Sequence, residues 1–140
     1  MPERKSPGDS LEEALARVLA AWPAVRVGWL FGSMAEGSAG PLSDVDVAVL
    51  GCASLSFDER AHLAVELTRA TGRSCDVVSV EHASPVLGME IVRCGKRFFC
   101  RDVDAADAWE DFALRRYLGT ANLRRIVYSH VREDLVNGAR

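Results

Sequence analysis

The chain has 140 residues, of which 49% are hydrophobic and 26% charged, and its formal net charge is −3 at pH 7. This balance is typical of a globular protein and excludes a disordered or fibrous chain. The length predicts one domain whose core is large enough to fold without disulfide or metal staples. Because surfaces that bind nucleic acid are strongly basic, we expect no stable nucleic-acid binding.

The four cysteines, Cys52, Cys75, Cys94 and Cys100, form no Cys-x-x-Cys pair and have no histidine at ligand spacing. A cysteine in an apolar segment packs as a small hydrophobe, so we expect reduced thiols and a cytoplasmic protein. No apolar run approaches the roughly 20 residues of a membrane span, and the N-terminal residues lack the apolar core of an export signal. The sequence therefore predicts no membrane association.

The N-terminal segment differs in composition from the rest of the chain. Residues 1–9 hold two prolines, a glycine and several charges, and we predict that they form a flexible tail. We expect residues 10–140 to form a single domain. Its core is predicted over 11–100 and a C-terminal helical segment over 104–136.

Helical and strand patterns alternate along the core. The predicted helices are 11–21, 57–70 and 85–94, and the predicted strands are 24–31, 44–50, 74–80 and 96–100. Gly28 within the first strand predicts close approach of another backbone. We expect an α/β (α+β) fold in which a three- to four-stranded mixed sheet is covered mainly on one side by helices, with 96–100 at an edge.

The C-terminal segment is predicted to be helical, with a break at Gly119-Thr120. Trp109, Phe112 and Tyr117 fall on one stripe of this segment. Such a stripe is more typical of a core or of a surface facing a partner than of a platform for stacking bases.

The most informative stretch runs from Leu30 to Leu50. It contains Gly32-Ser33, then ten residues, then Asp44-Val45-Asp46 and an apolar run. In a strand, Asp44 and Asp46 leave the same face, and the alternating valines point into a core. A Gly-Ser turn between a strand and a helix offers backbone amides and a hydroxyl to a phosphate. Two neighbouring carboxylates can hold two Mg²⁺ ions against that phosphate.

Asp76 is the third candidate acid, since it precedes a run of valines as Asp44 does. We expect it on an adjacent strand beside the pair, where it would bind the second metal and accept the proton of an attacking hydroxyl. The alternative is that Asp76 only completes a turn. Similarly, Gly32-Ser33 alone would be an ordinary helix start.

Two other sets of polar residues are assigned structural roles. Asp102-Val103-Asp104 repeats the tripeptide without an upstream Gly-Ser or a following strand, so we predict a helix cap there. The three histidines are scattered, and we expect surface or capping roles for His62, His82 and His130.

The combination of Gly32-Ser33, Asp44-Val45-Asp46 and Asp76 resembles the signature of nucleotidyltransferases of the DNA polymerase β superfamily. The short length and the Leu-Phe-Gly-Ser and Ser-Asp-Val-Asp segments are similar to the minimal nucleotidyltransferases, specifically the MntA-type antitoxins paired with HepT-type HEPN ribonuclease toxins. The resemblance covers about residues 11–100.

This resemblance implies a polymerase β-like fold and transfer of AMP from ATP, with two Mg²⁺ ions, to a tyrosine hydroxyl of a HEPN toxin. By position, Gly32 and Ser33 would hold the triphosphate, Asp44 and Asp46 the metals, and Asp76 would complete the triad. The expected partners are ATP and the toxin. A homo-oligomer and a hetero-oligomer with the toxin both remain open.

The sequence departs from the family at the turn, which commonly reads Gly-Ser-Arg-Ala-Arg-Gly in the family and reads Gly-Ser-Met-Ala-Glu-Gly here. Met34 and Glu36 remove two positive charges beside the expected phosphates. This predicts weaker ATP binding, unless those arginines serve the partner. Two alternative functions are an antitoxin that neutralises its partner by binding alone and nucleotidyl transfer to a small hydroxylated molecule such as an aminoglycoside.

Overall fold

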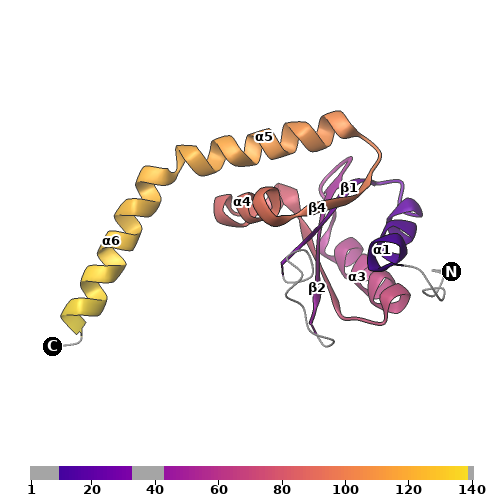
Figure 1. Ribbon diagram of the computed structural model, residues 1–140, viewed down its shortest axis with the longest axis horizontal. Helices are drawn as coiled ribbons and strands as arrows, with labels where there is room; N and C mark the ends of the chain where they lie inside the picture. Colours follow the sequence, from indigo (N-terminus) through magenta and orange to yellow (C-terminus); the bar gives the residue numbers. More distant parts are fainter. Residues whose placement is uncertain (1–9, 33–42, 139–140) are drawn as a thin grey trace.

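A four-stranded mixed sheet in the order β3-β2-β1-β4 forms the centre of the protein (Figure 1). The computed structural model describes residues 10–32 and 43–138, so the predicted tail over 1–9 lies outside it. The strands are β1 (Val25–Phe31), β2 (Val45–Gly51), β3 (Cys75–Ser79) and β4 (Lys96–Cys100). β1 pairs antiparallel with β2 and β4, whereas β2 and β3 run parallel. The predicted fold class and the edge position of β4 are confirmed.

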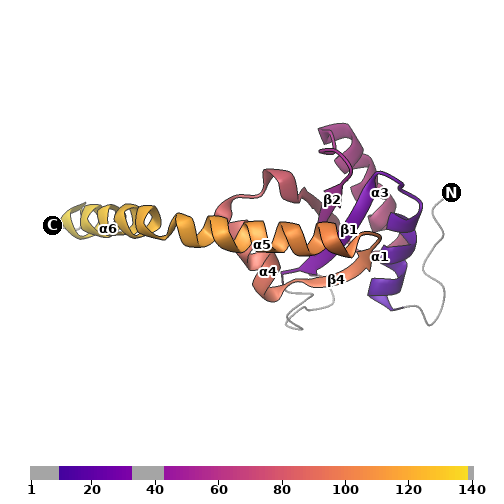
Figure 2. The ribbon, with the colours of Figure 1, turned by 90° about the horizontal axis from the view of Figure 1, so that it is seen from above.

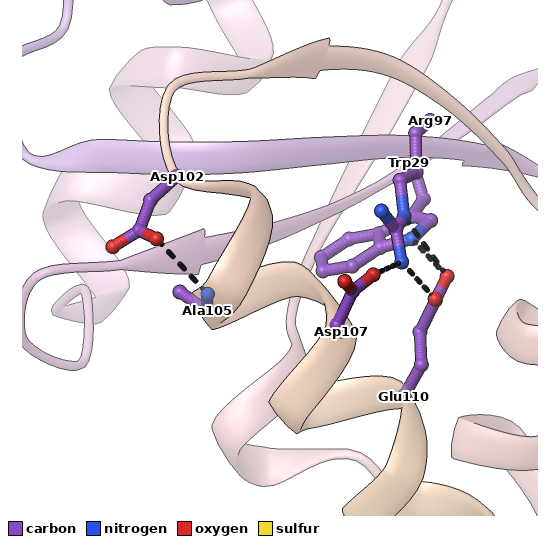
Figure 3. Close-up of polar contacts among 6 residues, drawn as sticks. All are labelled: Trp29, Arg97, Asp102, Ala105, Asp107 and Glu110. Carbon is purple, nitrogen blue, oxygen red and sulfur yellow. Dashed lines mark hydrogen bonds and ion pairs between the residues drawn. The ribbon is translucent and has the colours of Figure 1, made fainter.

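The helical segments agree closely with the sequence patterns. They are α1 (Leu11–Ala20), α3 (Phe57–Thr71), the 3-10 turn η1 (Val80–His82), α4 (Pro85–Cys94), α5 (Val103–Gly119) and α6 (Ala121–Gly138). Asp102 begins α5 as the predicted cap, because its carboxylate accepts a hydrogen bond from the backbone N–H of Ala105 at 3.0 Å (Figure 3).

α1 and α3 cover the first face of the sheet with a closed apolar core. Val45, Val47 and Val49 of β2 point to this face, where they join Leu15 of α1 and Leu63 of α3. All five side chains are fully buried. Burial of a valine or leucine side chain stabilises a fold by about 1.5–3 kcal/mol, so this face supplies much of the stability.

α4 and the beginning of α5 cover the second face. Ala48 and Leu50 of β2 point to it and pack in a cluster with Trp29 of β1, Ile91 of α4 and Ala106 of α5. Helices therefore cover both faces of the sheet, and not mainly one face as expected. The physical reason is that α4 has only ten residues and buries only a short part of its surface, so its sequence pattern does not reveal a second packed layer.

Gly28 has close neighbours, but they are side chains. A Cβ at this position would lie 2.5 Å from Cδ1 of Leu19 and 2.9 Å from Cζ of Phe98. The expectation of an approaching backbone was wrong, because the space above Gly28 is filled by an α1 leucine and a β4 phenylalanine. The glycine allows α1 to pack closely on the sheet.

Polar contacts fix α5 across the second face (Figure 3). The indole Nε1 of buried Trp29 donates a hydrogen bond to Oε1 of Glu110 at 3.1 Å. Arg97 of β4 forms ion pairs with Glu110 and, at 2.7 Å, with Asp107. Residues of two strands thus hold the first half of α5.

α5 and α6 form an arm that extends away from the sheet, as both views show (Figures 1 and 2). The predicted break at Gly119-Thr120 separates the two helices. α6 exposes large apolar side chains, namely Leu123, Ile126, Val127, Val131 and Leu135. Among the described residues, no helix is both long and apolar enough to cross a membrane.

The predicted aromatic stripe of α5 divides between a core position and exposed positions. Trp109 packs against Trp29 with ring centroids 5.0 Å apart. Phe112 is 54% exposed, and Tyr117 is half-buried near the end of the helix. The core role is therefore confirmed for Trp109, and the structure places Phe112 on the surface.

Candidate functional site

The beginnings of β2 and β3 bring the predicted carboxylates together. Parallel pairing places Asp46 directly opposite Asp76. Asp44 immediately precedes β2 and is exposed. Side chains alternate along a strand, so Asp46 lies on the same face as Ala48, and Asp76 lies on the same face as Val78. Ala48 and Val78 both belong to the apolar cluster of the second face. All three acids thus lie at one end of the second face.

Gly32 brings the end of β1 against this carboxylate group. Phe31 pairs with Asp46 across the β1–β2 ladder, and Gly32 follows with φ of +72°. A Cβ on Gly32 would lie 2.5 Å from Oδ2 of Asp46. Both the left-handed backbone and the close carboxylate therefore require glycine. Ser33, Met34 and Glu36 lie outside the described residues, and their expected roles stay predictions.

Burial and the neighbouring negative charges raise the pKa of Asp46 above its ordinary value. Burial is the largest cause, followed by the negative charges of Asp76, Asp44 and Glu90, and each of these raises the pKa. The half-buried carboxylate is thus surrounded by like charges. A divalent cation bound at this point would remove the repulsion, which makes the group suited to a metal.

The carboxylates can supply some of the ligands of Mg²⁺, and the phosphate oxygens of a bound nucleotide can supply others. Within the described parts of the chain, no three His, Cys, Asp or Glu side chains lie close enough together to enclose a metal ion. Mg²⁺ seldom needs such a cage, since it is usually bound by one or two carboxylates together with phosphate oxygens and water. Asp44, Asp46 and Asp76 offer oxygen ligands of this kind.

Two charged residues near the acids belong to no recognisable sequence motif. Glu90 comes from α4 and acts electrostatically on Asp46, although no motif connects it with the Asp-Val-Asp segment. Arg60 of α3 lines a pocket of about 190 Å³ with Asp76 and Phe57. Its Nε is buried and has no hydrogen-bond partner in the described structure. Only the packing of α3 and α4 against the sheet reveals either residue.

The three histidines are exposed, and two of them form polar contacts with neighbouring side chains. His62 lies 3.2 Å from Glu66 on α3, and Nε2 of His82 lies 2.7 Å from Oγ of Ser54. His130 is exposed on α6. The surface position predicted for each histidine is confirmed.

Comparison with known proteins agrees with this geometry. Residues 13–104 match the family described as polymerase beta, nucleotidyltransferase. Over 77 residues the chain is 35% identical to the protein adenylyltransferase MntA of Shewanella oneidensis, and the match covers 55% of this chain and 55% of that protein. The aligned part thus spans about half the length of the curated relative.

Solved structures share the fold over most of the chain. A chain of a toxin–antitoxin complex crystallised with AMP-PNP matches with a TM-score of 0.79 and 27% identity, covering 86% of this chain and 98% of that chain. A complex of an MNT antitoxin with a tri-AMPylated HEPN toxin of Shewanella oneidensis matches with a TM-score of 0.74 and 24% identity, covering 87% and 96%. The latter likeness shows the fold alone. Since the family match includes Gly32 and both strands that carry the acids, this chain belongs to the polymerase β family of nucleotidyltransferases.

Proposed function

We propose that this chain is a Mg²⁺-dependent protein adenylyltransferase that acts in the cytoplasm as the antitoxin of a HEPN ribonuclease toxin. It transfers AMP from ATP to a tyrosine hydroxyl of that toxin. The observation that carries the proposal is the alignment of Asp46 with Asp76, beside Asp44 and against Gly32. The 35% identity to a protein adenylyltransferase supports the choice of a protein acceptor.

Each residue of the site has a role in this reaction. Gly32 and Ser33 hold the triphosphate, and Asp44 and Asp46 hold two Mg²⁺ ions, with Asp76 binding the second of them. When bound there, Mg²⁺ would supply positive charge that neutralises the phosphates and makes the α-phosphorus a better electrophile. Asp76 accepts the proton of the acceptor hydroxyl. The acceptor oxygen then bonds to the α-phosphorus, the bond from that phosphorus to the oxygen bridging to the β-phosphate breaks, and pyrophosphate leaves.

The proposal is tested by incubating the protein with ATP, Mg²⁺ and the toxin encoded by the neighbouring gene. We expect the intact mass of the toxin to increase by one or more AMP groups, and chelation of Mg²⁺ to prevent this. The double variant Asp44→Asn, Asp46→Asn should form no adduct. The matched control is Asp102→Asn with Asp104→Asn, because the same tripeptide caps α5 there and asparagine also caps helices.

A second function is favoured by Met34 and Glu36, which replace the arginines common in the family. In this alternative the chain neutralises its toxin by binding. The same double variant separates the two functions. If it still neutralises the toxin, binding is sufficient; if it forms the complex but no longer neutralises, adenylyl transfer is required. If the wild-type protein neutralises the toxin without forming any AMP adduct, the enzymatic function is rejected.

A further inference from the structure

We propose that α6 packs antiparallel against α6 of a second copy of this chain, so that the free protein forms a symmetric dimer. The surface that carries this inference is a stripe of four apolar side chains, Leu123, Val127, Val131 and Leu135. Their exposed fractions are 62%, 50%, 50% and 71%. The inference concerns assembly, and it does not depend on the proposed adenylyl transfer.

Within a single copy, α6 has little to pack against. It extends away from the sheet and from the helices that cover the sheet (Figures 1 and 2). Over residues 121–137 of this helix, no side chain is buried. A helix of 18 residues without packing is only marginally stable in water, because most helical stability in proteins comes from burial of an apolar face. The exposed stripe therefore indicates that another chain covers this face.

The stripe is self-complementary about Ser129. When two identical helices pack antiparallel with a twofold axis at that level, residues at equal distances before and after Ser129 face each other. Leu123 of one copy then faces Leu135 of the other, and Val127 faces Val131. Side chains four residues apart form the ridge that packs in the commonest class of helix crossing. The two stripes thus cover each other along their whole length.

Charges beside the stripe favour the antiparallel direction. Arg124 and Asp134 lie on the same side of α6 as the stripe, because each is three residues from one of its valines and seven from the other. They are also equally far from Ser129, so antiparallel packing brings Arg124 of each copy beside Asp134 of the other. Parallel packing would instead align each charge with its own copy, and like charges repel.

Arg124 is oriented by contacts at the base of α6. Its guanidinium lies 3.6 Å from the centroid of the Tyr117 ring, and its Nη1 donates to the Tyr117 carbonyl oxygen at 2.7 Å. These groups are uncharged, and they orient the guanidinium without neutralising it. The attraction to a carboxylate of the second copy is therefore retained.

The shape of the arm leaves room for the second copy. α5 and α6 carry the tip of the arm away from the sheet (Figure 1). In the antiparallel pair the two sheets lie at opposite ends, so the folded bodies do not collide. The end of α6 at Gly138 reaches the level of Thr120 in the other copy, where α5 ends. The paired region is thus α6 alone.

Sedimentation velocity of the full chain without toxin tests the proposal. We expect twice the 15.2 kDa of one chain at high concentration and monomers on dilution, with a Kd of about 1–10 μM. Val127→Glu with Val131→Glu should raise the Kd at least about a hundredfold, because it buries unpaired charges. Val65→Glu with Val103→Glu is the matched control, since these valines are exposed on α3 and α5. A dimer that survives the α6 glutamates overturns the assignment of this face.

Asp134→Arg tests the direction of packing. In the antiparallel dimer it places two arginines together at both ends of the pair, so the Kd should rise by about fivefold at low salt. Glu133→Arg makes the same change of charge on the other side of α6 and should leave the Kd unchanged. In a parallel dimer Asp134→Arg would replace one like-charge pair by another. An unchanged Kd for Asp134→Arg therefore rejects the antiparallel arrangement.

Hydrogen exchange of the α6 amides supplies a readout on the wild-type chain, which does not require a variant to fold. We expect slow exchange in the dimer and faster exchange on dilution, because packing protects the helix. A wild-type chain that stays monomeric at about 100 μM, or whose α6 exchange does not depend on concentration, overturns the dimer. If the glutamate variant of α6 then also fails to bind the toxin, the toxin is the occupant of this face.

Discussion

The side chains of β2 point alternately into two different regions of the molecule. Val45, Val47 and Val49 enter a core that α1 and α3 close completely. Ala48 and Leu50 enter a second core under α4 and α5, but Asp46 on that same face is only half-buried and surrounded by acids. The first face therefore serves stability, whereas one end of the second face holds the acids to which we assign the chemistry. Substitutions on the two faces should have separable effects.

Asp46→Asn should produce the largest change, and activity and stability should move in opposite directions. Under the proposed function, loss of this carboxylate removes a Mg²⁺ ligand and should lower AMP transfer by at least about a hundredfold. Stability at neutral pH should rise, because the pKa of Asp46 is raised in the folded state and its charged form therefore opposes folding. That cost is absent below the ordinary pKa of 3.8 and develops as the pH rises through the folded-state pKa.

Thermal unfolding in metal-free buffer measures this effect. The Tm of the variant should exceed that of the wild type at pH 7 and should equal it near pH 3. An equal difference in Tm at both pH values would contradict an electrostatic origin.

Leu63→Ala should affect stability and leave the chemistry intact. Leu63 is fully buried on the first face, and truncation of such a leucine costs about 2–5 kcal/mol. Denaturant unfolding measures the loss, and AMP transfer per folded molecule should stay at the wild-type rate. Val65→Ala on the same helix is the control, because Val65 is 48% exposed and its truncation should change stability by less than about 0.5 kcal/mol.

Gly32→Ala should damage both stability and activity. A left-handed conformation costs a residue with a side chain about 1–2 kcal/mol, and the new Cβ would displace the Asp46 carboxylate. Gly72 provides a close control, since it has the same φ of +72° but has nothing within 4 Å of an added Cβ. We expect both variants to lose similar stability in denaturant and only Gly32→Ala to lose AMP transfer. Equal activity of the two would show that Asp46 tolerates the contact.

Arg97→Gln should have the smallest effect. Its ion pairs with Asp107 and Glu110 join β4 to α5 and are partly exposed, so we expect a loss of about 0.5–1 kcal/mol. Hydrogen exchange of the α5 amides should become faster. Arg115→Gln is the control because, in the described part of the chain, Arg115 pairs within its own helix, with Asp111 at 3.0 Å. If both substitutions changed exchange equally, the contact with β4 would not hold the helix.

The parts that could be predicted from the sequence are those encoded by neighbouring residues. Asp44 and Asp46 share a strand, so the period of two places their side chains on one face. Ser10, Ser56 and Asp102 cap helices through contacts with residues three positions later. Such local geometry needs no knowledge of the tertiary fold.

The remaining features depend on residues that are distant along the chain. Glu90 acts electrostatically on Asp46 because α4 packs on the second face, and Arg60 lines a pocket with Asp76 because α3 packs beside β3. Gly28 indicated a close contact, but the sequence could not show that Leu19 and Phe98 make it. The expected positions of Asp44, Asp46 and Asp76 are seen in the structure, and their catalytic roles stay predictions.

The junction of α5 and α6 is the point about which α6 can change its angle to the rest of the protein. α6 has 18 residues, and with a rise of about 1.5 Å per residue it is about 27 Å long. A force applied near the tip of α6 acts as a torque about the Gly119-Thr120 junction. Arg124 stacks on Tyr117 and donates to its carbonyl oxygen, so these residues connect the first turn of α6 to the end of α5. A small change of angle at the junction thus corresponds to a much larger displacement at the tip of α6.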